Sequence, residues 1–501
     1  MKMFSAITLV KVLPALASYV SAAASYPPIP ADLTTPFQMR IAINGPNAIS
    51  VGWNTYEKLA SPCVQHGLSS DALTLEECST TSVTYSTSRT WFNSVILPNL
   101  TPAITYYYKI VSTNSTIEQF MSPRVAGDKT QFALNAIVDL GVYGADGFTT
   151  SGDASKRETI PHVMPSLNHT TIGRLATTIN DYELIIHPGD LAYADDWYLA
   201  PKNWFDGTDA YEAILENFYE QLAPISGRKP YMVSPGNHEA DCEEVVLIAQ
   251  LCPAGQRNFT DFTNRFGQTM PTTFDSTSSN NTVKVLANTA KILANPPFWF
   301  SFEYGMVHVV MFNTETDFPN SPDGPGTTLN SGNFGALGQQ LAFLQADLAS
   351  VDRTITPWLV VAGHRPWYST GSSGSRCTEC QTAFEAIFYQ YGVDLEIFGH
   401  IHNSQRFLPQ FNGVADPNGM NDPKAPMSII SGGTGNIEGL SSVGTVTANN
   451  AFAYADDFSY ATVKFLNTTN LQIEFINSAT GAVLDSSVLY KSHTQQFVDQ
   501  S

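Results

Sequence analysis

Five short apolar segments of this chain each end in a glycine-containing turn that carries a side chain able to bind a metal ion. In one of them, Leu184-Ile-Ile-His-Pro-Gly-Asp190, the apolar run predicts a buried strand that Pro188 and Gly189 end. Side chains at the carboxyl ends of strands meet at the ligand site of α/β folds. The segments therefore predict an α/β domain whose strands bring polar side chains to one place.

These strand ends form an ordered set of motifs: Asp-x-Gly, Gly-Asp-x-x-Tyr, Gly-Asn-His-Glu, Gly-His and Gly-His-x-His. Each motif alone has an ordinary explanation, because such an Asp often caps a helix and Gly-Asn is a common turn pair. All five together, in order and at strand ends, indicate a site with oxygen and imidazole ligands for metal ions. The candidate ligands are Asp139, Asp190, Tyr193, Asn237, His364, His400 and His402.

The regions on either side of these motifs show the alternating pattern of β-structure. Five short candidate strands, separated by turn residues, predict an N-terminal β-sandwich of the fibronectin or immunoglobulin type over 30–126. We expect the catalytic α/β domain over 130–435, and a β-rich segment over 440–495 packed on that domain.

Two further patterns belong to the catalytic region. A helix is predicted by the spacing of Leu337, Leu341, Leu344 and Leu348, which places the four side chains on one core-facing side. The apolar segment Met427-Ser-Ile-Ile-Ser-Gly-Gly433 is expected to close the sheet.

The start of the chain has the composition of a secretory signal. Lys2 precedes a largely apolar stretch from Ile7 to Leu16, and small residues follow up to Ala24, so we expect 1–24 to be a signal peptide. No later stretch approaches about 20 apolar residues, and none is expected to span a membrane. The net charge of −20 disfavours nucleic acid and anionic membranes as partners. We therefore expect a secreted, extracellular protein.

Cysteines and glycosylation sequons agree with an oxidising destination. The six cysteines lie as sequence neighbours, which favours the pairs Cys63–Cys78, Cys242–Cys252 and Cys377–Cys380, although spacing alone does not decide the pairing. For Cys377 and Cys380 the alternative is a redox or zinc motif. The expected glycosylation sites are Asn99, Asn114, Asn168, Asn258, Asn280 and Asn467.

In its five motifs the chain resembles the purple acid phosphatases, a branch of the calcineurin-like metallophosphoesterases, and it looks closest to their secreted fungal members. The motifs span Asp139 to His402, about half of the chain. The resemblance implies an α/β (α+β) metallophosphoesterase sandwich, preceded by an all-β domain and followed by a β-rich segment.

The resemblance also implies a centre with two metal ions. Three of the ligands, Asp139, Tyr193 and His402, would bind a ferric ion. Asn237, His364 and His400 would bind a divalent iron, zinc or manganese ion, and Asp190 would bridge the two ions. The chemistry of the ligands agrees, because carboxylate and phenolate oxygens suit a trivalent ion and imidazole suits a divalent transition metal.

The implied activity is the hydrolysis of small-molecule phosphate esters at acidic pH by a metal-activated hydroxide. His238, next to Asn237, would stabilise or protonate the leaving oxygen. The loop Arg365–Arg376 lacks the histidines that plant-type relatives carry there, so the resemblance names no further proton donor.

Two other functions remain as alternatives. One is a phosphodiesterase or nucleotidase with two divalent ions, which Tyr193 disfavours because that phenol marks the ferric subgroup. The other is a non-catalytic secreted binding protein, which the complete ligand set disfavours. The sequence does not name the natural substrate (phytate, sugar phosphate, nucleotide or phosphoprotein) or the oligomeric state.

Overall fold

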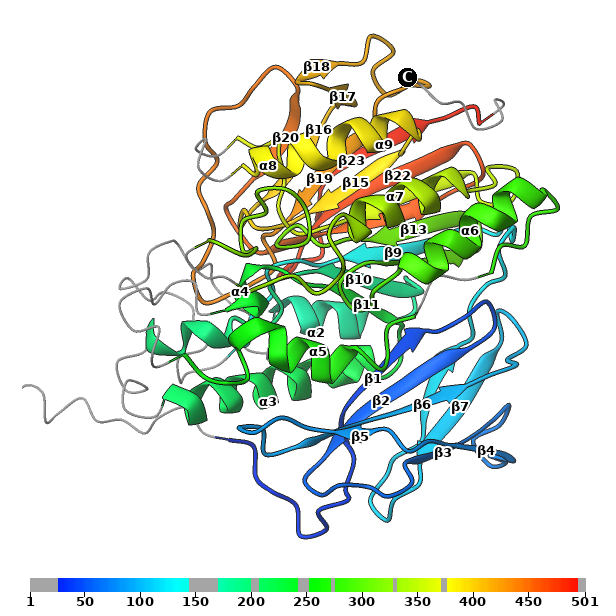
Figure 1. The fold of residues 1–501 in the computed structure, drawn as a ribbon, viewed down its shortest axis with the longest axis vertical. Helices are drawn as coiled ribbons and strands as arrows, with labels where there is room; N and C mark the ends of the chain where they lie inside the picture. The colour runs from blue at the N-terminus through cyan, green and yellow to red at the C-terminus, as the bar shows by residue number, and fades with distance from the viewer. Residues whose placement is uncertain are drawn as a thin grey trace, which may run out of the picture.

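An N-terminal β-sandwich lies beside a larger unit of two mixed sheets and their covering helices (Figure 1). The structure is a computed structural model that describes residues 26–143, 170–199, 207–241, 252–271, 275–327, 331–370 and 376–493. The predicted signal peptide lies outside these ranges. No helix within them is long and apolar enough to cross a membrane.

The N-terminal sandwich consists of two four-stranded sheets around buried Trp53. One sheet has the order β1 (Phe37–Ile43), β2 (Ile49–Thr55), β6 (Trp91–Leu97) and β5 (Ser82–Val83). The other has the order β4 (Leu75–Cys78), β3 (Cys63–Gly67), β7 (Thr105–Ile110) and β8 (Glu118–Met121). Sequence patterns did not indicate β3, β4 and β8, because they are short and β4 is largely exposed. A disulfide between the directly paired Cys63 and Cys78 fastens β3 to β4.

The catalytic unit contains a six-stranded and a seven-stranded sheet. The first has the order β11 (Tyr231–Ser234), β10 (Leu184–Pro188), β9 (Phe132–Ala136), β21 (Ser459–Phe465), β22 (Asn470–Asn477) and β23 (Val483–Tyr490). The second has the order β12 (Phe300–Tyr304), β13 (Val307–Met311), β14 (Trp358–Ala362), β15 (Leu395–Phe398), β19 (Met427–Ser431), β16 (Ser404–Phe407) and β20 (Asn450–Tyr454). Aromatic contacts of Phe132 with Tyr304 and of Trp358 with Phe465 join the two sheets in one core.

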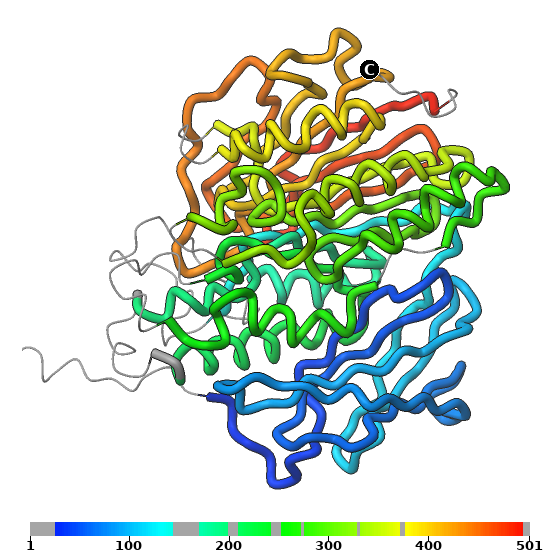
Figure 2. The backbone as a smooth tube through the Cα atoms, viewed as in Figure 1, coloured from blue at the N-terminus to red at the C-terminus, as the bar shows by residue number. Residues whose placement is uncertain are grey.

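Helices cover these sheets on their outer sides. On the second sheet, α7 (Gln339–Ala349) accepts a 2.6 Å hydrogen bond from Ser301 of β12 through Asp347, and Phe388 of α9 (Ala386–Gln390) packs on Phe312. Beside the first sheet lie α2 (Thr170–Thr177) and α3 (Gly207–Ser226) (Figures 1 and 2). The α3 helix also contacts β1, because the hydroxyl of Ser226 donates to the carbonyl of Met39. It therefore joins the catalytic unit to the N-terminal sandwich.

The C-terminal strands pack on the catalytic region by joining one of its sheets, because β21 pairs antiparallel with β9. Two sequence-based expectations about the catalytic region differ from the structure. The segment containing β19 does not close its sheet, since β16 and β20 lie beyond it. Leu337 precedes α7 and is 97% exposed, although Leu344 and Leu348 are buried as expected. Gly338, in a left-handed conformation, separates Leu337 from the helix.

Charged and hydroxyl side chains hold the sandwich against α3. Buried Glu212 of α3 accepts hydrogen bonds of 2.7 Å from the hydroxyls of both Tyr85 and Thr87. One turn later, Glu216 accepts from the guanidinium of Arg89 at 2.7 Å. These contacts form a polar interface between the sandwich and α3.

The predicted modification sites lie on the surface where they are described. Asn99, Asn114, Asn258, Asn280 and Asn467 are exposed, whereas Asn168 lies outside the described residues. Exposure is what glycosylation requires, and glycosylation itself stays a prediction.

Candidate metal centre

The carboxyl ends of five strands meet where the two sheets adjoin. Parallel strands β9, β10 and β11 of one sheet lead to Asp139, Asp190 and Asn237. Parallel strands β14 and β15 of the other lead to His364 and to the pair His400 and His402. Short strands followed at once by turns place these side chains at the shared edge rather than inside either sheet.

Tyr193, Asp139 and His402 form one group of candidate ligands around the phenol oxygen of Tyr193. This oxygen lies 3.1 Å from Oδ1 of Asp139 and 2.8 Å from Nε2 of His402. Nε2 of His402 is in turn 4.0 Å from Oδ1 of Asp139. The three side chains come from different strand ends, are buried, and direct their donor atoms toward one point.

A second group surrounds the side-chain oxygen of Asn237. Nε2 of His364 lies 3.1 Å from this oxygen, and Nδ1 of His400 lies 3.0 Å from it. The opposite nitrogen of His400, Nε2, lies 3.2 Å from the guanidinium of Arg365. The ring of His400 therefore directs Nδ1 inward, toward Asn237.

Asp190 contacts both groups through a single carboxylate oxygen. Its Oδ2 lies 3.3 Å from the phenol oxygen of Tyr193 and 2.9 Å from Nε2 of His364. The seven donors thus form two groups of three that share Asp190. That is the arrangement expected for two ions bridged by a carboxylate.

The backbone at this edge adopts an uncommon conformation at four of the seven residues. Asp139, Asp190, Tyr193 and His400 have φ values of 60°, 54°, 53° and 65°. Such left-handed conformations cost about 1–3 kcal/mol each in non-glycine residues and concentrate at functional sites. Backbone hydrogen bonds from Leu140 to the carbonyl of Asp190 and from Gly141 to that of Leu191 stabilise the adjoining turns.

Glu239 fixes the loop that carries Asp190. Its carboxylate accepts hydrogen bonds from the backbone N–H groups of Asp190, Leu191 and Gly236, at 2.9, 2.7 and 2.9 Å. The first two amides belong to the loop after β10 and the third to the loop after β11. Glu239 therefore ties together the two loops that supply Asp190 and Asn237.

Two glycines are required for steric reasons. A Cβ at Gly236 would lie 2.2 Å from Oδ1 of Asp190, and one at Gly399 would lie 2.4 Å from Oδ2 of Asp139. Any other residue at either position would displace a candidate ligand. The glycines of the motifs thus serve close packing as well as turn formation.

His238 is oriented by a carboxylate that sequence analysis did not single out. Nδ1 of His238 lies 2.8 Å from Oδ2 of Asp195, and Nε2 lies 3.9 Å from Oδ2 of Asp190. The backbone N–H of His238 also donates to Oδ1 of Asp190 at 2.9 Å. One side of the imidazole is therefore bound to Asp195, and the other side faces the centre.

Burial and neighbouring charges shift the pKa values of these groups strongly. Burial would raise the pKa of Asp190, but the imidazoles of His364 and His238 outweigh it and hold that pKa well below its usual range. Burial, helped by the imidazole of His238, lowers the pKa of His402 to about 3. Asp190 is therefore ionised and His402 neutral, which are the states that bind metal ions.

Burial raises the pKa values of Asp139 and Tyr193. Burial lowers the pKa of His364, but the carboxylate of Asp190 outweighs it and raises that pKa to about 9, so these three side chains release protons when they bind ions.

The pKa of His238 shifts in the opposite direction to that of His402. Burial lowers its pKa, but the carboxylates of Asp195 and Asp190 outweigh burial and raise that pKa well above the usual range. The imidazole is therefore protonated and can give up a proton from Nε2.

The residues suit a pair of metal ions on structural grounds. Oδ2 of Asp139 is buried without a hydrogen-bond partner in the described part of the chain, and a buried carboxylate oxygen needs a cation or a donor. Asp139 and Tyr193 offer hard anionic oxygens, whereas His364 and His400 offer imidazole nitrogens beside Asn237. The two groups of donors thus differ in the ions that they suit.

The structure brings all seven predicted ligands and His238 to one site. Asp195 and Glu239 were not predicted as site residues. Glu239 is the last residue of the motif Gly-Asn-His-Glu, and Asp195 lies two residues after the motif that ends at Tyr193. Their closeness to these motifs was the signal that could have identified them. Cys377 and Cys380 form a disulfide across the short helix α8 (Thr378–Cys380), and Cys252 is also disulfide-bonded. The expected partner of Cys252, Cys242, lies outside the described residues.

Comparisons with known proteins give consistent results along the chain. A family model described as the N-terminal domain of purple acid phosphatase matches residues 36–125. A calcineurin-like phosphoesterase model matches 166–404, and an iron/zinc purple acid phosphatase-like protein C model matches 425–486.

Individual proteins are similar over most of their length. Acid phosphatase A of Cryphonectria parasitica is 64% identical over 504 residues, covering 99% of this chain and 100% of that protein. Probable purple acid phosphatase 20 of Arabidopsis thaliana is 27% identical over 422 residues, covering 82% of this chain and 76% of that protein. The solved structure of a purple acid phosphatase from yellow lupin seeds aligns with a TM-score of 0.64 at 21% identity, covering 91% of this chain and 75% of that chain.

Proposed function

This chain belongs to the purple acid phosphatases, and from that membership we propose that it hydrolyses phosphate monoesters at acidic pH at a centre of one ferric and one divalent ion. It is an acid phosphatase, and the family depends on two metal ions. The observation that carries the finer assignment is the sharing of Asp190 between the two groups of donors.

In this proposal Asp139, Tyr193 and His402 hold the ferric ion, and Asn237, His364 and His400 hold the divalent ion. The phenolate of Tyr193 supports the ferric assignment, because a trivalent ion readily displaces a phenol proton. Iron, zinc and manganese all suit the second group. Two such ions and three anionic ligands leave a charge of about +2, which favours a phosphate dianion.

When bound, the two ions supply a nucleophile from water below neutral pH and neutralise charge on the phosphoryl oxygens. The residues of the chain do the rest. Glu239 holds the loop of Asp190 through three amides and so fixes the bridging carboxylate. His238, kept protonated by Asp195, gives its Nε2 proton to the leaving oxygen. The left-handed backbone of four ligand residues keeps the centre pre-organised.

We further propose that the protein acts outside the cell. The apolar segment after Lys2, the disulfides and the exposed sequons support this. An oxidising, acidic medium suits an enzyme that needs a ferric ion and operates below neutral pH.

The decisive experiment assays a phosphate monoester and a diester side by side at acidic and neutral pH, with metal analysis of the same protein. We expect monoester hydrolysis to dominate at acidic pH, with iron and one divalent metal in equal amounts. Preference for the diester at neutral pH, with two divalent metals, would instead assign a phosphodiesterase. Protein found only inside cells that carry the full chain would contradict secretion.

A further inference from the structure

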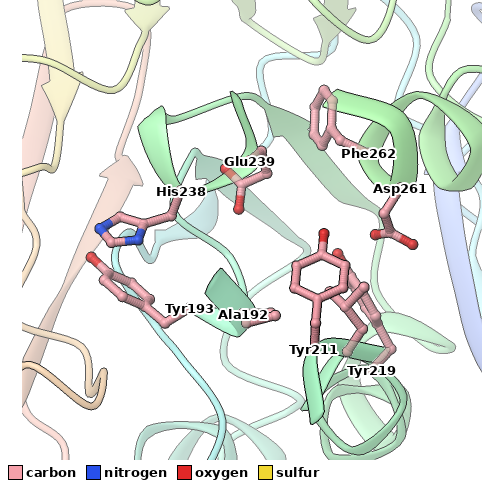
Figure 3. Close-up of a pocket in the computed structure, with 10 residues that line it drawn as sticks. Ala192, Tyr193, Tyr211, Tyr219, His238, Glu239, Asp261 and Phe262 are labelled. Atoms are coloured by element: carbon pink, nitrogen blue, oxygen red, sulfur yellow. The ribbon is translucent and has the colours of Figure 1, made fainter. Parts of the chain in front are cut away.

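A small polar cavity lies behind the metal centre, on the side that faces the N-terminal sandwich. Its volume is about 10 Å³, enough for about one water molecule. Tyr193, His238 and Glu239 line it from the centre, and Tyr211 and Tyr219 of α3 line it from the opposite side with Asp261 (Figure 3). The cavity thus separates the loop of Asp190 from α3.

The two tyrosines of α3 bring hydrogen-bond donors to this cavity. The side chains of Tyr211 and Tyr219 are buried and line the cavity, and no hydrogen bond of either hydroxyl is found among the described residues. Neither hydroxyl is one of the fully buried polar atoms that lack a partner, so both are open to a water molecule in the cavity. A pair of such groups that line one cavity therefore indicates a shared acceptor inside it.

The carboxylates of Glu239 and Asp261, which line the cavity, each have an oxygen that can accept a further hydrogen bond. Oε1 of Glu239 accepts one hydrogen bond, from Leu191, and Oδ2 of Asp261 accepts one, from Nε of Arg265 at 3.2 Å. A carboxylate offers about four lone-pair positions, so each oxygen has capacity for another donor. Figure 3 shows the carboxylates of Glu239 and Asp261 near the hydroxyl of Tyr211.

We propose that this cavity holds one ordered water molecule that accepts from Tyr211 and Tyr219 and donates to Glu239 and Asp261. A water has two acceptor and two donor positions, which equals the two unpaired hydroxyls and the two carboxylates. Such fully bonded internal water is an integral part of a fold and costly to remove. Tyr211 and Tyr219 are then positioning residues for the metal centre.

The water would act on the centre through Glu239. This carboxylate holds the amides of Asp190, Leu191 and Gly236, so a fourth hydrogen bond fixes its orientation. Asp261 continues the network, because it accepts from Tyr85 of the sandwich at 3.1 Å. The N-terminal sandwich therefore supports the bridging ligand and is more than a spacer. This consequence rests on the proposed role of Asp190, whereas the water itself does not.

Crystallography of the metal-loaded enzyme at about 1.5 Å tests the site directly. We expect one density peak within hydrogen-bonding distance of both tyrosine hydroxyls, Glu239 and Asp261. An empty cavity, a metal ion in it, or direct bonds from the hydroxyls to the carboxylates would overturn the proposal. None of these outcomes depends on which substrate or metal the enzyme uses.

The double variant Tyr211→Phe/Tyr219→Phe tests the positioning role, because it removes both donors and keeps the rings. We expect loss of the water, faster hydrogen exchange at the amides of Asp190 and Leu191, and a fall in kcat of about tenfold with KM and metal content unchanged. The matched control is Tyr304→Phe, which removes a partly buried 2.7 Å hydrogen bond to Glu183 away from the cavity. Wild-type exchange and kcat in the double variant, or equal losses in the control, would refute the positioning role.

Discussion

Nδ1 of His238 lies 2.8 Å from Oδ2 of Asp195, and both side chains are buried beside the candidate metal centre. The carboxylate of Asp195 fixes the ring, while Nε2 faces Asp190 of the candidate metal centre at 3.9 Å. This pairing supports the proposal that His238 is a general acid and that Asp195 is its positioning residue. Because Asp195 acts through His238, substitutions of the two residues should have non-additive effects on the rate.

Asp195→Asn should lower kcat about 10- to 100-fold and leave metal content unchanged. Asp195 raises the pKa of His238, so its loss lets that pKa fall and shifts the alkaline limb of the kcat profile to lower pH. A pH series of kcat measures both effects. The same substitution made in His238→Ala should have little further effect, and additive losses would show that Asp195 acts elsewhere.

His238→Ala should bind both metals normally and lose about 10²–10⁴-fold in rate. The loss should shrink for esters with good leaving groups, because their leaving oxygens need little protonation. Rates measured across a series of aryl phosphates give this dependence. Equal losses across the series would assign His238 to phosphate binding instead.

Asp190→Asn should nearly abolish activity and lower the content of both metals. Oδ2 of Asp190 contacts both groups of ligands, and an amide cannot replace its charge. Elemental analysis of the purified variant measures the loss. Both metals at wild-type stoichiometry would contradict the bridging assignment.

If Tyr193 binds a ferric ion as proposed, phenolate-to-iron charge transfer colours the wild-type protein, and Tyr193→Phe should remove that colour. The ring packs on His238 at 4.1 Å between centroids, and Phe retains this packing, so the fold should survive. Absorption spectra before and after mild oxidation test the prediction. A wild-type protein that stays colourless with only divalent metals would remove the ferric assignment.

Glu212→Gln should alter how stability depends on pH at the interface between the sandwich and α3. Burial raises the pKa of Glu212 to about 7, although the hydroxyls of Thr87 and Tyr85 oppose it. A raised carboxyl pKa makes the folded state bind more protons, so its contribution is complete below about pH 4.5 and is lost as pH rises through about 7.

The shift in the Glu212 pKa corresponds to about 3 kcal/mol, and Gln should abolish this pH dependence. Thermal unfolding of wild type and variant between pH 4.5 and 8 tests this. Parallel stability curves for the two proteins would show that Glu212 titrates normally.

The elements of the catalytic region illustrate what could be predicted from the sequence. The apolar runs before Asp139, Asp190, Asn237, His364 and His400 became β9, β10, β11, β14 and β15. Each run is short and buried, and all but β9 end in or are directly followed by glycine or proline, so their structure depends on neighbours along the chain. Elements with weaker local signals were missed, among them β4, which depends on a disulfide and on pairing with β3.

What the sequence by itself determined is therefore the strand ends, their candidate ligands and the order in which they occur, because local hydrophobic patterns and turn residues specify them. Only the tertiary structure decided that these strands belong to two sheets and that Asp190 is shared between two groups of donors. It alone paired His238 with Asp195 and placed Tyr211 and Tyr219 behind Glu239. It also inserted β21 next to β9, more than 300 residues away in sequence. These relationships join segments far apart in the chain, and no local pattern encodes the packing that brings them together.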